Sequence, residues 1–550
     1  MEPGTRSIVP GVKDAGDSAL LLELDNVIDA QVNAHAIAIA AAVRAEGIRG
    51  VRDVVSTFRS VAVYFDPLIA DAVAVRAALE RAAASPGDVR GGRHVEVPVA
   101  YGGEFGPDLE AVALFAGLTP AQVIERHTAA DYRVFMLGFL PGFAYMGIVA
   151  REIAAPRKGT PRLRVPGGSV GIAGPQTAIY PRDSPGGWQI IGRTALQLFD
   201  PARRPATLFS PGDTVRFVRE SSGEVRLKPD TTNEVEYVSS GFSRTLTVLR
   251  PGLFTTIQDR GRWGHQGIGV PVSGAMDLAS HRAANALVGN PADAATLEAT
   301  LLGPELRIEQ DTMLAVTGAD LSASIDGRAV PPNSPIRGRA GAVLRFGDRR
   351  QGTRAYVACD GGIAVPAVLE SRATHVVSAM GGVGGRPLKA GDRLPLGPFA
   401  PSLPLKTPAR PMRPAAGGVR VRVLPGPQDD YFTDTAFEVL QGSRFSVSTQ
   451  SDRMGYRLQG PRILPAAGRE MISDATFAGA IQVPASGEPI LLMADRQTTG
   501  GYPQIATVIT ADLPGAAQLA PGDWIEFEIC SRADARAALV AQEGRLRAIG

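Results

Sequence analysis

The residues best suited to bind an anion lie in one short segment late in the chain. Residues 451–457 read Ser-Asp-Arg-Met-Gly-Tyr-Arg, which places Arg453 and Arg457 four residues apart, with Asp452 beside the first. A guanidinium can hold a carboxylate or phosphate through two parallel hydrogen bonds. The segment therefore predicts an anion site, with Asp452 and Arg453 in catalysis and Arg457 in substrate binding. A surface loop of ion pairs is the alternative for the same residues.

Two other stretches, more than three hundred residues apart, resemble one another. The first has Val-Pro-Gly-Gly-Ser at 165–169, Gln-Thr-Ala-Ile-Tyr-Pro at 176–181 and Pro-Gly-Asp at 211–213; the second has Val-Pro-Ala-Ser-Gly at 483–487, Gln-Thr-Thr-Gly-Gly-Tyr-Pro at 497–503 and Pro-Gly-Asp at 521–523. Strands and turns do not require Gln, Thr and Tyr in this order. Their repetition predicts a shared site in glycine-rich loops whose N–H groups face an anion, with tight hairpin turns as the alternative. The residues predicted to bind substrate are Ser169, Gln176, Thr177, Tyr180, Thr498 and Thr499, and Tyr502 is predicted to be catalytic.

Polar residues also stand at the start of a helix expected at 276–287. Ser273 and Asp277 flank a Gly-Ala-Met turn, and a helix N-terminus both binds anions and needs a capping side chain. We expect Ser273 either to cap this helix or, together with Asp277, to bind substrate. His281 and Asn285 are one turn apart, so both can face one cleft, although core or surface positions fit them equally well.

Three further residues in the first half of the chain are candidates for chemistry. His127, near an expected helix end, is predicted to act as a general acid or base because imidazole titrates near neutral pH; a structural role is the alternative. Arg157 and Arg162 lie on either side of Pro161 in a loop, where we expect phosphate binding or plain solvation. The six histidines form no HxxH or HExxH pattern, so no bound metal is expected.

The composition is that of an ordinary globular protein of several domains. Its 550 residues predict three to five domains, and its 63 glycines and 43 prolines indicate many tight turns between short strands. Lys plus Arg (57) nearly equals Asp plus Glu (55), so neither nucleic acid nor a membrane is an expected partner. Two cysteines, no signal segment and no long apolar run predict a cytoplasmic protein.

The order of patterns predicts a mainly β protein with an α+β N-terminal domain. Helices are expected at 27–46 and 69–84, two short helices within 108–131, and strands at 18–25, 61–64 and 95–100. The Gly-Asp pair at 391–392 indicates that the middle module is a degenerate relative of the other β-rich parts. The predicted domains are 1–97 (small, α+β, ferredoxin-like), 98–219 (barrel), 220–244 (linker), 245–400 (first β-rich module of the second half), 401–530 (second barrel) and 531–550 (terminal helix).

Longer motifs carry a family resemblance. The allophanate hydrolase subunit 1 family, which includes the B component of bacterial 5-oxoprolinase, has motifs similar to Met136–Tyr145, Pro166–Gly174 and Ser184–Trp188. The allophanate hydrolase subunit 2 family, which includes the C component of the same enzyme, has motifs similar to Ile257–Arg262, Gly269–Asp277 and Ser451–Arg457. Both families resemble the halves of the carboxyltransferase domain of urea carboxylase. The chain thus resembles a fusion of two usually separate subunits, and the resemblance implies tandem cyclophilin-like β-barrels.

The resemblance also implies a function. It points to the B and C component of an ATP-dependent 5-oxoprolinase, which activates 5-oxo-L-proline for ring opening to L-glutamate with ATP, Mg²⁺ and a separate A subunit. Arg260 and Arg372 join the predicted substrate- or nucleotide-binding residues. Glu370 and Gln504 replace a Gly and a Lys usual in the family, and each change can weaken an anionic contact. A homo-oligomer is compatible with the sequence.

Two other functions fit the same resemblance. One is a biotin-dependent carboxyltransferase acting on urea or a related amide, and the other is a regulator that inhibits a histidine kinase. The chain has no Met-Lys-Met biotin-attachment site and no phosphate-binding P-loop. No covalently attached biotin is therefore expected, and carboxyl transfer would need a separate biotinylated partner.

Overall fold

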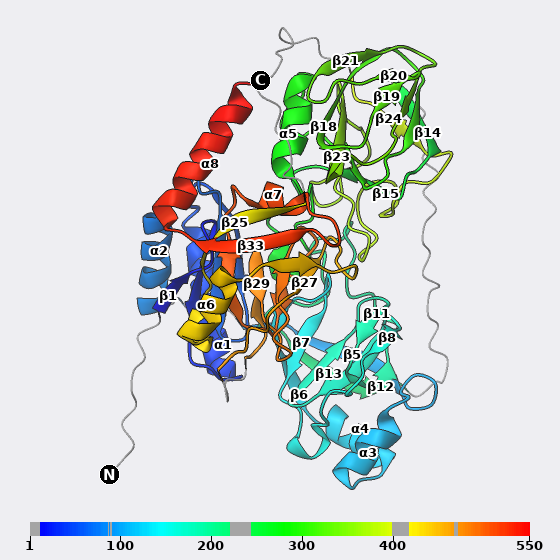
Figure 1. Ribbon diagram of the computed structural model, residues 1–550. Helices are drawn as coiled ribbons and strands as arrows, with labels where there is room; N and C mark the ends of the chain where they lie inside the picture. The colour runs from blue at the N-terminus through cyan, green and yellow to red at the C-terminus, as the bar shows by residue number, and fades with distance from the viewer. Residues whose placement is uncertain are drawn as a thin grey trace.

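The computed structural model describes residues 11–85, 87, 91–220, 244–398, 417–466 and 471–549. In chain order it contains an α/β unit, a closed β-barrel, a module of two open sheets, a second closed barrel and a C-terminal helix (Figure 1). The mainly β fold with tandem barrels, predicted from the sequence, is confirmed. The predicted linker at 220–244 lies almost entirely outside the described residues.

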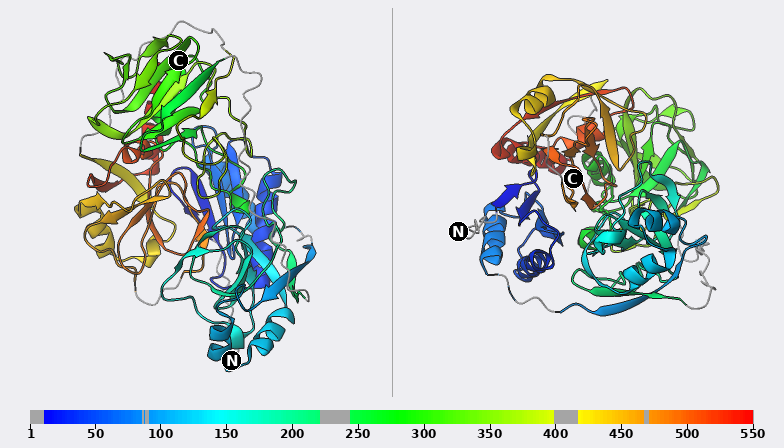
Figure 2. Two further views of the ribbon diagram at one scale, coloured as in Figure 1. Left: turned by 90° about the vertical axis from the view of Figure 1, so that its right-hand side faces the viewer. Right: turned by 90° about the horizontal axis from the view of Figure 1, so that it is seen from below.

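The N-terminal α/β unit is an antiparallel sheet covered by two helices. Its strands are in the order β1 (Gly11–Asp14), β2 (Ala19–Glu23), β4 (Ser60–Phe65) and β3 (Val51–Ser56), and the helices are α1 (Ala30–Ala45) and α2 (Ala72–Ala84). Leu20, Ile39 and Leu79 form the core between sheet and helices. The other face of the sheet packs on the second barrel, because Leu21 and Tyr64 cluster with residues of that barrel (Figure 2).

The two barrels have the same topology. Each is closed by parallel pairing of its first and last strands: β5 with β13 in the first, β25 with β33 in the second. The first barrel contains β5 (His94–Tyr101), β6 (Asp131–Leu137), β7 (Ala144–Gly147), β9 (Ser169–Ala173), β10 (Gln176–Ile179), β12 (Gln189–Arg193) and β13 (Thr214–Arg219). The second contains β25 (Gly418–Pro425), β26 (Phe445–Val447), β27 (Gly455–Gln459), β29 (Ala480–Gln482), β30 (Ile490–Leu492), β32 (Gln504–Val508) and β33 (Trp524–Ile529).

Shorter elements complete the correspondence between the barrels. A small two-stranded sheet flanks each one: β8 (Arg162–Val165) with β11 (Ser184–Gly186), and β28 (Asp474–Ala475) with β31 (Thr499–Gly500). Helices α3 (Leu109–Ala116) and α4 (Pro120–Thr128) follow the first strand of one barrel, and α6 (Asp434–Gly442) follows that of the other. A short helix, α7 (Leu513–Ala517), precedes the last strand of the second barrel.

This topology revises the repeat seen in the sequence. The two Pro-Gly-Asp segments are equivalent, because each leads into the last strand of its barrel. The two Gln-Thr pairs are not equivalent, since Gln176 and Thr177 lie in β10, whereas Gln497 and Thr498 lie in the loop after β30. The expected strand at 95–100 also belongs to the first barrel as β5, not to the small N-terminal domain.

The middle module consists of two open sheets and is not a closed barrel. One sheet has the order β20-β19-β22-β17-β14-β24 and the other β15-β16-β23-β18-β21. Their bounds are β14 (Thr245–Arg250), β15 (Phe254–Gln258), β16 (Thr296–Thr300), β17 (Glu305–Ile308), β18 (Thr312–Asp320), β19 (Ser324–Ile325), β20 (Arg328–Ala329), β21 (Pro335–Gly338), β22 (Val343–Arg345), β23 (Gln351–Cys359) and β24 (Arg393–Pro395). An apolar core that includes Val248, Leu297 and Val357 fills the space between them.

Two helices connect this module to the second barrel. Helix α5 (Leu278–Leu287) packs on β18 and β23, and α8 (Arg532–Arg547) runs from the second barrel to α5 (Figure 1). Ala535 of α8 packs against the barrel, and Leu546 packs against the module. Within the described residues, no helix is both long and apolar enough to cross a membrane.

Candidate functional site

One pocket gathers several of the predicted site residues at an opening of the second barrel. It has a volume of about 280 Å³ and lies between β27, β29, β30 and the loop that follows β30. Asp452, Arg457, Thr499 and Tyr502 all line it. We call this cavity the barrel pocket; its lining residues are Gln450, Asp452, Met454, Gly455, Arg457, Thr476, Gln482, Ile490, Leu492, Arg496, Gln497, Thr499, Gly500 and Tyr502.

A carboxylate and a guanidinium, those of Asp452 and Arg457, both line the barrel pocket. Asp452 is exposed, and its Oδ1 accepts hydrogen bonds from the backbone N–H groups of Met454 (2.8 Å) and Gly455 (3.3 Å). Those bonds fix the carboxylate at the turn, and Oδ2 accepts no hydrogen bond from the described part of the chain. The side chain of Arg457 is also exposed and has no hydrogen bond or ion pair to any residue that the structure describes. An open acceptor and an unpaired cation can bind a ligand that carries both an N–H donor and an anionic group.

The loop after β30 joins the barrel pocket to the first barrel. The backbone N–H of Phe139, in the loop between β6 and β7, donates to Thr499 Oγ1 over 3.1 Å. Thr498 is buried, and its hydroxyl has no partner among the described residues. Tyr502 is 48% exposed at the rim. The loop therefore presents Tyr502 to a ligand, while Thr499 fastens the two barrels together.

Arg453 does not line the barrel pocket but lies in a buried ion network, which favours a structural role over the predicted catalytic one. Its Nε donates to Asp495 Oδ2 (2.9 Å), its Nη2 to Asp495 Oδ1 (3.0 Å) and to the Gly274 carbonyl (2.7 Å), and its Nη1 to Glu298. The two carboxylates raise the pKa of Arg453. Arg453, Asp495 and Glu298 are all buried. The network ties the second barrel to the middle module, so Arg453 has a structural role.

The cluster at the start of α5 is buried in the same region. Asp277, not Ser273, caps the helix by accepting a hydrogen bond from the Ser280 N–H (2.8 Å). Ser273 has a positive φ of 57° and donates its hydroxyl to Asp495 (2.6 Å) and the Thr374 carbonyl. The capping role expected for Ser273 is therefore wrong, and its hydroxyl stabilises the ion network instead.

His281 and Asn285 face the interior of the middle module. His281 Nδ1 is 2.9 Å from Thr296 Oγ1, and Asn285 Nδ2 donates to the Ala294 carbonyl (2.8 Å). Both side chains are fully buried, and burial lowers the pKa of His281 to about 4. They hold α5 on the sheet, which contradicts the expected cleft.

His127 is a core residue of the first barrel, a position that favours the structural alternative over the predicted acid–base role. Its Nδ1 is 2.8 Å from the Tyr101 hydroxyl and its Nε2 is 3.0 Å from Thr177 Oγ1. The ring packs against Phe217 with centroids 4.5 Å apart. Burial lowers the pKa of His127 to about 3, which leaves the imidazole neutral and out of reach of a ligand. Thr177, which also donates to the Gly171 carbonyl, has the same structural role.

The remaining predicted residues of the first barrel differ in burial and in partners. Arg162 pairs with Asp108 (2.7 Å), as does Lys158 (2.9 Å), whereas the exposed Arg157 guanidinium lies 5.8 Å from the centre of the Trp188 ring. Tyr180 is buried among aromatic rings, and burial raises its pKa to about 12. Ser169 and Gln176 begin β9 and β10; the first is buried and the second has a buried Oε1 without a partner among the described residues.

The two arginines added from the resemblance differ in environment. Arg372 donates its backbone N–H to Asp259 (2.5 Å) and its Nε to the Val365 carbonyl (2.8 Å), so it stabilises loops of the middle module. Arg260 is exposed and lines a second pocket, between the α/β unit and the module. Gln504, the family departure on β32, is fully buried and donates to the Ala475 carbonyl, and so lies away from solvent.

The residues of the barrel pocket that the sequence reasoning missed include Gln450, Gln482 and Arg496. The first two are single polar residues in loop or strand context, and no pattern distinguishes them. Arg496 directly precedes the Gln-Thr-Thr loop predicted to form a site, so its position was a usable signal. In the described part of the chain, no cluster of three or more His, Cys, Asp or Glu side chains could hold a metal ion.

Comparison with known proteins agrees with the tandem-barrel fold. The model of the carboxyltransferase domain, subdomains C and D, matches residues 10–209, and that of subdomains A and B matches residues 268–529. The chain is 41% identical to the C component of 5-oxoprolinase from Escherichia coli over 53% of the chain and 93% of that protein, and 42% identical to the B component from Bacillus subtilis over 40% and 98%. The crystal structure of TTHA0988 superposes with a TM-score of 0.82 at 35% identity, covering 93% of this chain and 99% of that one.

These matches define a carboxyltransferase-domain protein. The chain belongs to the family of the B and C components of 5-oxoprolinase and joins the two parts in one polypeptide. It is also 34% identical to urea amidolyase of Lachancea kluyveri over 55% of the chain, but spans only 18% of that longer protein.

Proposed function

We propose that the chain is the B and C component of an ATP-dependent 5-oxoprolinase and that 5-oxo-L-proline binds in the barrel pocket. The single observation that carries this proposal is that one pocket is lined both by the exposed Asp452 carboxylate and by the Arg457 guanidinium, which has no partner among the described residues. 5-Oxoproline has one carboxylate and one lactam amide. Arg457 would hold the carboxylate through charge-assisted hydrogen bonds, and Asp452 would accept the lactam N–H.

The other polar residues of the pocket fit the rest of this ligand. Tyr502 and Gln482 can donate to the lactam carbonyl, and donors aimed at that oxygen stabilise the negative charge that develops when the amide is attacked or activated. Ile490 and Leu492 provide an apolar wall for the ring methylenes. Binding of this kind orients and polarises the lactam, and the separate A subunit would take part in ring opening.

The resemblance to 5-oxoprolinase implies ATP with Mg²⁺. The described residues contain no cluster that would hold Mg²⁺ by itself, so in this proposal the ion arrives with the nucleotide, whose phosphates supply most of its ligands. Activation by ATP would turn the lactam oxygen into a better leaving group. The chain's own contribution is to hold the lactam still and to donate hydrogen bonds to its oxygen.

Titration calorimetry with 5-oxo-L-proline tests the pocket. Arg457→Ala should weaken binding about 10- to 100-fold, because a hydrogen bond to a charged group is worth about 1.5–3 kcal/mol, and Asp452→Asn should weaken it as well. Arg420→Ala, an exposed arginine elsewhere on the same barrel, is the matched control and should bind as the native chain does. Unchanged affinity in Arg457→Ala would refute the assignment of the pocket.

The activity needs a second assay. Oxoproline-dependent ATP hydrolysis should require both this chain and a separately purified A subunit, and glutamate release should follow. Glutamate formation by the chain alone, at the rate of the reconstituted mixture, would contradict the proposal.

Carboxyl transfer to urea or a related amide is the second candidate, favoured by the carboxyltransferase-domain match and the likeness to urea amidolyase. Urea offers N–H donors to Asp452 but has no carboxylate for Arg457. Under this alternative, urea would bind with an affinity that Arg457→Ala leaves unchanged, and 5-oxoproline would not bind. Mass spectrometry should find no biotin attached to the chain in either case.

A further inference from the structure

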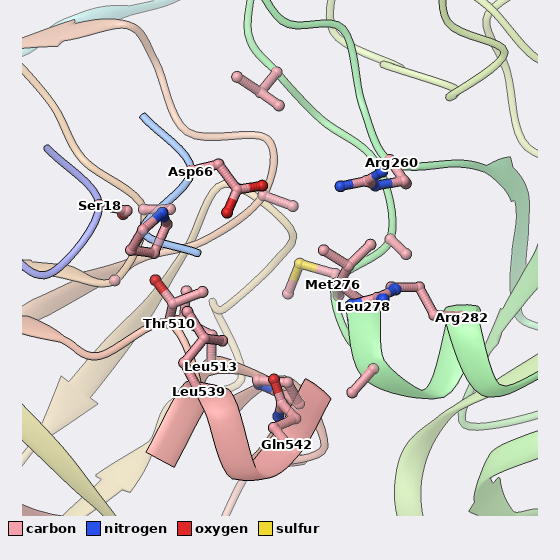
Figure 3. A pocket seen from close by; sticks show the side chains of 18 of the residues that line it. Ser18, Asp66, Arg260, Met276, Leu278, Arg282, Thr510, Leu513, Leu539 and Gln542 are labelled. Carbon is pink, nitrogen blue, oxygen red and sulfur yellow. The ribbon is translucent and has the colours of Figure 1, made fainter. Parts of the chain in front are cut away.

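A second cavity lies where four parts of the chain meet. The α/β unit, the segment leading into α5, the second barrel and helix α8 all contribute to its wall (Figure 3). Its volume is about 200 Å³. We call it the junction pocket. The α/β unit lies in the region matched by subdomains C and D, residues 10–209, and most of the other lining residues lie in the region matched by subdomains A and B, residues 268–529, so the pocket spans the boundary between the two matched regions.

The charged groups of the junction pocket are unbalanced. Arg52 pairs with Asp66, and the Arg282 guanidinium makes two hydrogen bonds to Glu543 of α8, at 2.8 and 2.9 Å. These pairs neutralise the carboxylates that line the cavity. Two lining guanidiniums, of Arg260 and Arg496, are left over and give the pocket an excess of positive charge.

Arg496 is a buried cation without a buried anion to balance it. It is only 3% exposed, and its Nη2 donates to the neutral amide oxygen of Gln266 (2.9 Å). Its Nη1 has no hydrogen bond to any described residue, and no described carboxylate forms an ion pair with it. Burial lowers the pKa of Arg496. A buried charge is costly unless it is paired, so an anion bound in the cavity would stabilise this side chain.

Arg260 faces the cavity from another side. It is exposed and makes no hydrogen bond or ion pair within the described ranges. In Figure 3 its guanidinium points into the pocket toward Asp66, which stands on the opposite wall and is already paired with Arg52. The guanidinium of Arg260 is therefore available to a ligand.

Most of the rest of the wall is apolar, although Ser18, Thr510 and Gln542 also line it. Met276 and Leu278 line it near α5, Leu513 and Leu539 line it from α7 and α8, and Trp263 adds an aromatic surface. Such a wall favours burial of an apolar or aromatic body. An inorganic anion has no apolar part and would leave this apolar surface in contact with water.

We propose that the junction pocket is a second ligand site, which takes an anion with an apolar or aromatic body and holds its charged group with Arg260 and Arg496. The anionic group is a phosphate or a carboxylate, as found in a nucleotide or an organic acid. Arg496 also lines the barrel pocket, so a ligand in one cavity can shift the side chain that borders the other. This proposal does not depend on the substrate assigned to the barrel pocket.

Fluorescence offers a direct test on the full chain. Trp263 lines the junction pocket, whereas Trp188 and Trp524 do not. Titration with 8-anilinonaphthalene-1-sulfonate, a sulfonate on an aromatic body, should give saturable energy transfer that Trp263→Phe largely removes. Displacement by ATP would identify a nucleotide as the type of ligand, and displacement by octanoate but not ATP would identify a carboxylate. Inorganic phosphate should compete at least tenfold more weakly than the better of these two.

Matched variants distinguish binding at the junction pocket from non-specific electrostatic attraction of anions. Arg260→Ala should weaken binding of the fluorescent probe about tenfold, and Leu68→Glu, which places a carboxylate on the exposed rim, should weaken it at least as much. Arg250→Ala, an exposed arginine on β14 far from the cavity, should have no effect. Absence of saturable binding, equal binding in Arg260→Ala and Arg250→Ala, or phosphate that competes as well as ATP and octanoate would overturn the proposal.

Discussion

Replacing Arg453 should damage the fold rather than the chemistry, because its guanidinium is the shared partner of two buried carboxylates. In Arg453→Met the side chain keeps its length but loses its charge and its hydrogen bonds. Asp495 then stays buried without its ion-pair partner, and Glu298 keeps only the more distant Arg354, at 3.9 Å. Breaking a buried ion pair by removing one partner costs about 3–5 kcal/mol. The loss falls on the interface between the second barrel and the middle module.

Urea unfolding followed by circular dichroism measures this loss. With a denaturant slope of about 1–3 kcal/mol/M, the transition of this part of the chain should move down by roughly 1 M or more. Arg453→Lys should recover only part of the shift, since an ammonium cannot make the planar two-point contact with Asp495.

Arg457 provides the matched control from the same motif. Arg457→Met removes an exposed side chain without a partner among the described residues, so stability should change by no more than about 0.5 kcal/mol, while 5-oxoproline binding weakens. If Arg453→Met keeps its unfolding midpoint and loses only turnover, the assignment of Arg453 to a structural network is wrong.

Two further perturbations follow from the packing of the first barrel. The pKa of His127 is lowered to about 3 from 6.5, so its contribution to stability is present above pH 6.5 and is lost as the pH falls toward 3; at pH 5 the loss is about 2 kcal/mol. In His127→Gln, the free energy of unfolding measured by urea titration should differ less between pH 7 and pH 5 than it does in the native chain. An equal difference in the two proteins would contradict a neutral, buried imidazole. A Cβ at Gly138 would lie 2.1 Å from Thr499 Oγ1, so Gly138→Ala should lower stability by about 1–3 kcal/mol. Adding Thr499→Ala should restore part of that loss, and no restoration would argue against a direct clash.

The motif at 451–457 illustrates how far sequence reasoning reached. The sequence correctly indicated that this segment is unusual, and it predicted equal roles for Arg453 and Arg457. Four residues apart on β27 and the turn before it, the two side chains point to different places: Arg453 into the interface with the middle module, Arg457 into the barrel pocket. The spacing of residues along the chain does not show which segments pack against each side chain. Burial therefore distinguishes Arg453 from Arg457, although the sequence motif treats them alike.

The repeated segments show a second limit. Both Pro-Gly-Asp turns precede a last strand, because the Gly lets the chain turn and the residue after the Asp begins a strand with alternating apolar residues. The Gln-Thr pairs, by contrast, occupy different places in the two barrels, one in a strand that faces the core at Thr177 and one in a loop. Similar residues in a similar order therefore do not occupy equivalent positions in the two barrels.

The sequence by itself determined the elements and the family. Alternating apolar residues with Gly and Pro turns predicted the strands and barrels, and long motifs predicted the relationship to the components of 5-oxoprolinase. Both kinds of pattern depend on neighbours along the chain. Only the tertiary structure decided which polar residues are accessible. His127 and Arg453 became buried because other segments cover them, and the junction pocket exists only where four distant parts of the chain meet. Accessibility and charge balance depend on neighbours in space, and one sequence does not specify which distant segments those neighbours are.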